Sequence, residues 1–499
     1  VSDRLTKLLT TTLIEDKEIK DGIQKIIDEI VDPAIYVLTD WQAKGYITED
    51  EVKRWSKEEG DKIDAIVEEV LTRDRPDPKV ATRNIRLATP EITDAPYSHE
   101  LLSLSMSEAI RLAQAEAMEE NPNVLVFGTD VVKGLGIHGG EFIQEGGYFN
   151  QQDGLFEKFG MIPHKITNTA INENSVAKYL SGMSTTFTGN GKLNETNRIL
   201  YDPQYVDYGI EAWPAFYVQG NRLYLTDGAI TTTFGMLLLS GSSKGTGPMH
   251  AGELVSIAYQ MPASVDIFYA SDPETGYKSL KDNMLHNNNP YIFMADKTRI
   301  YERQTFERGT GLLPPGKARV VKEGKGAQII GYGPMISKTM DVLDSGSLRP
   351  ELAETTGVLD LVSLRPFPLN DFKTFLSDAT GPIFIAHEEP IGKWEDDTSD
   401  DHQEPVIKGF GAQIASLLVT NPELYEMVKD RLPVYMIGSK PTPVVPCDDI
   451  YMREVVPTKE RVYRLLTDYE RERRAKQRRN PNKDSKDNPY NRYTVYQRK

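Results

Sequence analysis

Residues 166–183 read ITNTAINENSVAKYLSGM, and this stretch predicts how the surrounding chain folds. Ile166 closes an apolar segment typical of the end of a strand. Asn168 and Asn172 are turn formers, and Glu173 stands where a helix is expected to begin. In α/β folds, ligands bind at such strand-to-helix junctions. Glu173 is therefore either a binding-site carboxylate or an acid that only the helix dipole favours.

The sequence on both sides of this stretch alternates between short apolar runs and amphipathic segments. Ser105 and Glu108 form a predicted capping box for a helix through Glu120, and residues 124–127 read as a buried strand. Further strands are predicted at 265–269, 291–294, 328–332, 358–361, 383–386 and 434–437. Residues 223–239 suggest a hairpin or a strand. This alternation predicts an α/β fold with two doubly wound, mostly parallel sheets.

A helical extension is predicted before the first sheet. Asp32-Pro33 opens one helix, Gly45 ends it, and Thr48 with Glu51 forms a capping box for the next helix. That second helix carries an apolar stripe, and the residues that follow it, up to residue 98, read as an extended linker. The start of the chain at Val1 is compatible with a processed amino terminus.

Composition narrows the class of protein. The 499 residues are 39% hydrophobic and 26% charged, which is ordinary for a globular protein. No apolar run approaches the roughly 20 residues that a membrane span requires, so no span is expected. The one cysteine, Cys447, excludes an internal disulfide and fits a reducing compartment.

Charge is distributed unevenly along the chain. Residues 471–499 contain 11 Lys or Arg against 3 Asp or Glu, a net charge of +8. Because the whole chain has a net charge of −16, residues 1–470 carry −24. An acidic body disfavours non-specific nucleic-acid binding. The clustered Arg and spaced Tyr of residues 471–499 suit a polyanionic partner, either RNA or an acidic protein surface. A solvated tail without a partner is the alternative.

Three segments occur in a defined order within residues 100–466, and they are Asn168-Thr169-Ala170-Ile171-Asn172-Glu173, Gln204-Tyr205-Val206-Asp207-Tyr208 and Gly245-Thr246-Gly247-Pro248-Met249-His250. They resemble the Asp-Thr-Pro-Ile-x-Glu, aromatic strand and Gly-Gly-Pro-x-His motifs of the beta-type subunit of 2-oxo acid dehydrogenase decarboxylase components, which use thiamine diphosphate. The resemblance implies a transketolase-like pyrimidine-binding domain at 99–312, a transketolase C-terminal-like domain at 313–468 and a basic tail at 469–499. Residues 1–98 resemble the carboxyl terminus of an alpha-type subunit.

The resemblance also implies roles for individual residues. Glu173 would hydrogen-bond the aminopyrimidine ring of thiamine diphosphate as a partly desolvated carboxyl that holds and shares a proton. Tyr205 would stack on the pyrimidine, and Thr129 would lie near the cofactor where relatives have a carboxylate. His250 would face the substrate carbonyl and carry protons. The structural alternatives are a core aromatic on a strand for Tyr205 and a loop histidine bound to backbone for His250.

Cofactor and partners follow from the same resemblance. The chain has no Gly-Asp-Gly segment of the kind that holds the diphosphate and magnesium in relatives, so no metal ligand is expected here. An alpha-type subunit would supply that half of the site. The resemblance implies a heterotetramer-like assembly, a lipoyl acyltransferase core as acceptor, and a location in the mitochondrial matrix or the bacterial cytoplasm.

Two interpretations remain open at this stage. The chain is either the active beta-type part of a 2-oxo acid dehydrogenase, of pyruvate or branched-chain type, or a catalytically inactive relative in a large assembly such as a mitochondrial ribosome. Thr129, the Ala251-Gly252 pair where relatives have Ser-Gln, and the basic tail favour the second interpretation. A transketolase or deoxyxylulose phosphate synthase would share the fold, but residues 313–318 and 383–412 resemble the dehydrogenases.

Overall fold

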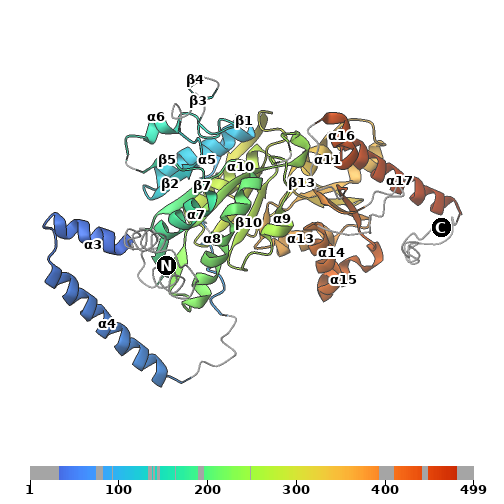
Figure 1. Ribbon diagram of the computed structural model, residues 1–499. Coiled ribbons are helices and arrows are strands. Elements are labelled where there is room, and N and C mark those ends of the chain that lie inside the picture. Colours follow the sequence, from blue (N-terminus) through green and yellow to red (C-terminus); the bar gives the residue numbers. More distant parts are fainter. Residues whose placement is uncertain are drawn as a thin grey trace, which may run out of the picture. The chain divides into compact units, whose positions relative to one another are not determined.

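A computed structural model of the chain describes residues 33–74, 83–90, 92, 94–132, 137–138, 141–142, 146–162, 164–188, 196–247, 249–392, 409–440 and 448–479. The chain divides into two units, Val1–Ala81 and Thr82–Lys499 (Figure 1). Cys447 and residues 480–499 lie outside the described residues. Among the described helices, none combines the length and apolar character that crossing a membrane requires.

The described part of the first unit contains two helices, α3 (Pro33–Ala43) and α4 (Glu49–Thr72). Gly45 has a φ of 71° between them, in the left-handed region that glycine adopts readily. The capping box of Thr48 and Glu51 is confirmed, because each side chain bonds the other residue's backbone N–H. None of the α4 residues is buried, and the side chains of the predicted apolar stripe are 40–60% exposed, as at Trp55 and Ile63.

The second unit is built on two sheets, and the first has seven strands. In spatial order these are β16 (Ser363–Arg365), β10 (Asp266–Ala270), β11 (Tyr291–Asp296), β9 (Phe234–Ser240), β7 (Arg198–Asp202), β2 (Val124–Gly128) and β5 (Ile166–Asn168). β16 runs antiparallel to β10, whereas all other neighbours are parallel. Strands of a parallel sheet are buried on both faces, which is why they read as continuous apolar runs.

Helices cover both faces of the first sheet (Figure 1). One face packs on α7 (Glu173–Met183), α8 (Val206–Leu225) and α9 (Val255–Ala258), and the other on α5 (Met106–Glu120), α6 (Leu155–Phe159) and α10 (Pro273–His286). Side chains alternate along each strand, so Met236 and Leu238 enter one core while Leu237 and Leu239 enter the other. This is the predicted doubly wound arrangement.

The second sheet has five strands in the order β13 (Arg319–Lys322), β15 (Gly357–Asp360), β14 (Gln328–Gly331), β17 (Ile383–Pro390) and β18 (Tyr435–Ser439). β13 is antiparallel and the rest are parallel. One face packs on α13 (Leu369–Ser377), α14 (Gly411–Thr420) and α15 (Pro422–Val428), and the other on α11 (Pro334–Asp344), α12 (Pro350–Thr355) and α17 (Lys459–Arg479). The α/β class with two mostly parallel sheets is therefore confirmed.

Smaller elements complete the second unit. They are the antiparallel pairs β1 (Ser98–Leu104) with β12 (Gln304–Gly309), β3 (Ile137–His138) with β4 (Glu141–Phe142), and β6 (Thr185–Phe187) with β8 (Ile230–Thr232), the helix α16 (Asp449–Val455), and the 3-10 turns η4 (Ser242–Lys244) and η5 (Lys429–Arg431). The predicted capping box of Ser105 and Glu108 at the start of α5 is confirmed.

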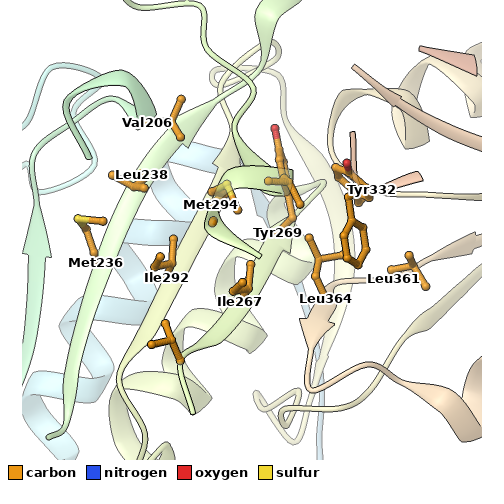
Figure 2. Close-up of a cluster of buried hydrophobic side chains, with 14 of the residues drawn as sticks. Val206, Met236, Leu238, Ile267, Tyr269, Ile292, Met294, Tyr332, Leu361 and Leu364 are labelled. Carbon is orange, nitrogen blue, oxygen red and sulfur yellow. The ribbon is translucent and has the colours of Figure 1, made fainter. Parts of the chain in front are cut away.

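The two sheets share one hydrophobic core (Figure 2). Tyr269 of β10 and Tyr332, just after β14, meet there with ring centroids 5.4 Å apart. Between β15 and β16 the chain crosses from the second sheet to the first, and Val362 accepts a hydrogen bond of 2.8 Å from the Tyr269 N–H. The boundaries predicted at 98, 312 and 468 stay predictions.

Of the two alternatives for residues 223–239, the strand is confirmed and the hairpin is wrong. Leu223 lies in α8, Asp227-Gly228 is the turn that leaves this helix, and the strands β8 and β9 follow it. Helix α17 continues past the predicted boundary at 468 and ends at Arg479. Arg473 and Arg474 in its last turns bond Glu470 at 2.9 and 2.5 Å and lie near Glu351, so these guanidinium groups have partners within the chain.

A short segment at 83–90 is tied to the amino-terminal edge of the first sheet. Arg83 and Asn84 both bond Asp227, and the Arg86 guanidinium donates to both oxygens of Asp266 at 2.8 Å. Leu87 exchanges two backbone hydrogen bonds with the Asn289 side chain, at 2.8 and 2.9 Å. The two ion pairs differ in burial. Arg83 and Asp227 are exposed, whereas the Asp266 side chain is fully buried.

We expect these two ion pairs to differ in their contribution to stability. Arg86→Ala should lower the free energy of unfolding by about 2–3 kcal/mol, since it leaves a buried carboxylate with Asn287 as a remaining donor. Arg83→Ala should cost less than about 1 kcal/mol, as exposed pairs do. Urea unfolding followed by circular dichroism measures both variants. Equal losses would show that burial of Asp266 does not set the cost.

Candidate active site

Glu173 is the first residue of α7 and follows the short strand β5. The strand–turn–helix predicted for residues 166–183 is therefore confirmed. Asn172 caps the helix, because its side-chain oxygen accepts a hydrogen bond of 3.0 Å from the Ser175 N–H. Since the neighbouring strands are parallel, Glu173 lies at the edge of the sheet where their carboxyl ends meet. Its side chain is half-buried.

Unpaired oxygen atoms surround this position. Within the described residues, two buried side-chain oxygens at this edge have no hydrogen-bond partner, those of Thr129 and Asn174, whereas the Thr169 and Tyr201 hydroxyls lie within reach of each other. Thr129 and Thr169 follow β2 and β5, and their N–H groups bond Asp202 and Gly128 across the sheet. Burial, and after it the Glu173 carboxylate, raises the pKa of the Tyr201 phenol. An unpaired buried polar group costs about 1–3 kcal/mol, so a polar ligand that paired with these oxygens would be favoured.

Tyr205 lies at the start of a helix and not on the predicted aromatic strand. It is the N-cap of α8, and the side chain is 3% exposed. Edge-to-face contacts surround the ring, with the centroid of His250 at 4.6 Å and that of Tyr208 at 5.8 Å. Tyr148 and Phe149 pack on it at 5.5 and 5.7 Å. Tyr205 therefore supports His250 from within the core.

Tyr208 is the tyrosine that joins the predicted residues, and sequence analysis assigned it no role. Its hydroxyl is 2.7 Å from Nε2 of His250. Burial raises the pKa of Tyr208, and the carboxylates of Asp207 and Glu173 raise it further. The phenol thus lies within the electrostatic reach of Glu173 while it bonds His250. Had residues 204–208 been interpreted as the start of a helix, Tyr208 would have been indicated beside Tyr205, because residues three apart lie on one face of a helix.

The loop that carries His250 is fixed by hydrogen bonds at both ends. Ser240 donates to Glu253 at 3.0 Å, and the buried Lys297 ammonium donates to the Gly241 carbonyl at 3.0 Å. The Gly252 N–H donates to Asp207 at 3.1 Å, and a Cβ at Gly252 would lie 2.6 Å from that carboxylate. The Ala251-Gly252 pair, which departs from the resembled motif, thus has a packing reason in this chain.

Thr129 is held through its backbone. The Gln204 amide donates to the Thr129 carbonyl at 2.7 Å, and Gln151 donates to Gln204 at 2.7 Å. Asp202, also bonded by Gln151, is fully buried, and burial raises its pKa to about 6. The structure therefore places all four predicted residues at the carboxyl ends of neighbouring strands. Among the described residues, no group of His, Cys, Asp or Glu side chains is arranged to hold a metal ion.

Part of the chain matches a known protein family, and most of it is similar to known proteins. Residues 103–302 match the family described as transketolase, pyrimidine binding domain. The mitochondrial 2-oxoisovalerate dehydrogenase subunit beta of Chaetomium thermophilum is 23% identical over 372 residues, 73% of this chain and 69% of that protein. The pyruvate dehydrogenase E1 component subunit beta of Bacillus subtilis is 25% identical over 293 residues, 58% and 81% of the two chains.

Two further similarities are of the same kind. The acetoin:2,6-dichlorophenolindophenol oxidoreductase subunit beta of Cupriavidus necator is 23% identical over 288 residues, 57% of this chain and 79% of that protein. A solved structure described as a split gene transketolase, inactive beta4 tetramer, superposes with a TM-score of 0.48 at 15% identity, over 73% of this chain and 98% of that one. Residues 103–302 are thus similar to the pyrimidine-binding domain of transketolases, and most of the chain is similar in sequence to beta subunits of 2-oxo acid dehydrogenases.

Proposed function

We propose that this chain is the beta-type part of a thiamine diphosphate-dependent 2-oxo acid dehydrogenase, which decarboxylates a 2-oxo acid and passes the acyl group to a lipoyl arm. The observation that carries the proposal is the set of unpaired buried oxygens beside Glu173, with Tyr208 and His250 at the same edge. An alpha-type subunit and a lipoyl acyltransferase core would be its partners, in the mitochondrial matrix or the bacterial cytoplasm.

The residues present fit the pyrimidine half of the cofactor. An aminopyrimidine carries amine donors and ring-nitrogen acceptors, which the unpaired oxygens of Thr129 and Asn174 complement. When bound, thiamine diphosphate supplies the nucleophilic carbon that attacks the 2-oxo carbonyl. Glu173 would hold a proton at the ring nitrogen, the role for which a half-buried carboxyl is suited. Because Tyr205 is buried, it would pack against His250 and would not stack on the pyrimidine ring.

Tyr208 would set the orientation and the tautomer of His250. Because burial and nearby carboxylates raise the pKa of the phenol, Tyr208 keeps its proton and donates it to Nε2. With Nε2 as the acceptor, the imidazole would carry a proton on Nδ1 and would donate it to a substrate oxygen. The edge-to-face contact with Tyr205 limits rotation of the same ring.

We expect Tyr208→Phe to lower kcat about tenfold, toward the lower end of what positioned proton transfer contributes. The change removes the hydrogen bond to His250 and keeps the ring that packs on Tyr205. KM for the 2-oxo acid should change less than about threefold, since the phenyl ring still fills the same volume. Steady-state kinetics of the complex reconstituted with the alpha-type subunit measures both values. A loss confined to KM would contradict a positioning role.

If two subunits share the cofactor site, a second prediction follows for cofactor binding by this chain alone. Because the sequence has no Gly-Asp-Gly segment of the kind that holds the diphosphate and magnesium in relatives, the chain alone should bind thiamine diphosphate with magnesium at least about a hundredfold more weakly than the reconstituted complex. Isothermal titration calorimetry with and without the alpha-type subunit tests this. Tight, magnesium-dependent binding to the chain alone would overturn it, and no binding by the complex would overturn the proposed function.

A further inference from the structure

The His250 loop, residues 241–254, joins β9 to α9 and ends at a helix of a single turn. Leu254, the N-cap of α9, provides no side-chain hydrogen bond to this helix. The first N–H groups of any helix need acceptors from outside it, and an isolated turn is not stable by itself. The end of the His250 loop therefore depends on contacts with another part of the chain.

Glu389 of β17, in the second sheet, makes these contacts. Its Oε1 accepts hydrogen bonds of 2.7 Å from both the N–H and the hydroxyl of Ser256, in the first turn of α9. Its Oε2 accepts from the Phe410 N–H at 2.6 Å and from the Tyr332 hydroxyl at 3.0 Å. The side chain of Glu389 is buried, and each of its oxygens has two donors. The carboxylate thus joins the start of α9 to the second sheet.

The same carboxylate supports the other end of α9 through Phe410. The ring of Phe410 packs on Tyr259, which directly follows α9, with ring centroids 4.7 Å apart. Gly409 has a φ of 87°, and a Cβ at this position would lie 2.9 Å from the Cβ of Glu389. A side chain at 409 would therefore displace the backbone that presents the Phe410 N–H. Residues at both ends of α9 are held by groups bonded to Glu389.

Glu388, the preceding residue of β17, bonds the beginning of the His250 loop. It accepts a hydrogen bond of 3.2 Å from the Ser243 N–H and pairs with Lys338 of α11. Because successive side chains of a strand point to opposite faces, Glu388 and Glu389 leave β17 in different directions. The loop that leaves the first sheet is thus bonded near both of its ends to one strand of the second.

Few residues separate Ser256 from His250, and those between them are also fixed. Glu253 accepts a hydrogen bond from the end of β9, and the Gly252 N–H donates to the first turn of α8. A displacement at Ser256 therefore has no free stretch of chain in which to be absorbed before it reaches His250. The contact that would change is the 2.7 Å hydrogen bond between His250 and Tyr208.

We propose that Glu389 is a positioning residue for His250, which acts from the second sheet by fixing α9. This inference rests on the proposed function, in which His250 faces the substrate. Glu389 accepts from two backbone N–H groups, those of Ser256 and Phe410, which cannot turn to another acceptor as hydroxyls can. The amide of Glu389→Gln has one acceptor oxygen, so one of these N–H groups loses its partner.

Kinetics of the complex reconstituted with the alpha-type subunit gives the first test. Glu389→Gln should lower kcat about tenfold or more, because a displacement of about 1 Å in a catalytic site can cost a factor of about 100. KM for the 2-oxo acid should change less than about threefold, since no substrate contact is removed. Tyr332→Phe is the matched control, because it removes a donor from Oε2 and leaves both bonds to Ser256. Its kcat should stay within about twofold of the wild type.

Nuclear magnetic resonance of the full chain with 15N-labelled histidine gives a second readout, which loss of stability alone would not change. The Nε2 chemical shift of His250, assigned with His250→Asn, reports the hydrogen bond to Tyr208. It should change in Glu389→Gln and remain at the wild-type value in Tyr332→Phe. Ser256→Ala removes only the hydroxyl bond to Oε1 and should change the same signal less. Circular dichroism verifies that each variant is folded, and Ser256→Ala carries the comparison if Glu389→Gln does not fold.

The two readouts separate this inference from the proposed function. An unchanged His250 signal in the folded Glu389→Gln and Ser256→Ala variants, or an equal change in Tyr332→Phe, would overturn the positioning role. A loss confined to KM would overturn it as well. A wild-type complex without turnover would overturn the proposed function, whereas the His250 signals of the chain alone would still decide whether Glu389 positions this side chain.

Discussion

Glu173→Gln is expected to lower turnover of the reconstituted enzyme by a factor of about 100 or more, the scale of general acid–base catalysis. The amide keeps the shape of the side chain at the start of α7, where Asn172 still caps the helix. It is not able to accept or return a proton at the cofactor ring. The unpaired oxygens beside it remain, so binding of thiamine diphosphate should change less than about tenfold. The loss therefore appears in kcat.

The measurement combines steady-state turnover with calorimetric cofactor titration of the same reconstituted complex. Glu323→Gln is the matched control, because Glu323 is exposed and lies beyond β13 of the second sheet. Its activity should equal that of the wild type. Turnover by Glu173→Gln within about threefold of the wild type would remove Glu173 from the proposed chemistry.

Arg319→Ala is expected to lower the free energy of unfolding by about 3–5 kcal/mol, the cost of breaking a buried ion pair. The Arg319 guanidinium bonds Asp272, Glu274 at 2.8 Å and the fully buried Asp360 at 3.3 Å. These contacts join β13 and β15 of the second sheet to the start of α10 beside the first. Without the guanidinium, Asp360 keeps the Ser271 hydroxyl as a donor but faces no cation.

The loss should be larger at pH 8 than at pH 5. Burial raises the pKa of Asp360 to about 7, although Arg319 opposes that shift. The folded protein therefore retains a proton that the unfolded chain releases at a pH of about 4, and this group's contribution to stability falls as pH rises between these values. Removing Arg319 raises the folded pKa further, so the fall continues to higher pH.

Urea unfolding at both pH values, with Arg349→Ala as the control, measures this difference. Arg349 is half-exposed and its nitrogen is 3.7 Å from Glu470, so its removal should cost less than about 1 kcal/mol at either pH. An Arg319→Ala loss that does not depend on pH would show that Asp360 is not the group left without a partner.

Local patterns were sufficient to predict much of the fold. The capping boxes at Thr48 and Ser105 depend on residues three apart, and parallel strands appear as short apolar runs, so both can be read from neighbouring residues. The segment at Tyr205 could not be read in this way. Tyr and Val favour strands locally, and Pro214 lies inside α8, so local propensity argues against the helix that tertiary packing imposes.

In the candidate site, too, some residues could be predicted from their sequence neighbours and others could not. Glu173 could be identified because a strand end, a turn and a helix start are adjacent in the sequence. The hydrogen bond between Tyr208 and His250 joins residues 42 apart, and the unpaired oxygens of Thr129 and Asn174 follow different strands. Their proximity depends on the order of strands in the sheet, which no single segment contains.

In the chain, the strand β16 lies between strands of the second sheet, but it pairs with the first sheet. This limits where the chain can be cut and how the two sheets can move relative to each other. After β15, residues 363–365 join the edge of the first sheet, so a gene split at 312 would give an amino-terminal product with an open β10 edge. The carboxyl-terminal product would present the β16 segment without its neighbour. A hinge between the sheets is equally disfavoured, since rotation would break the pairing of Ile267 with Arg365. The pairing of β16 with β10 therefore ties the two sheets together within the second unit.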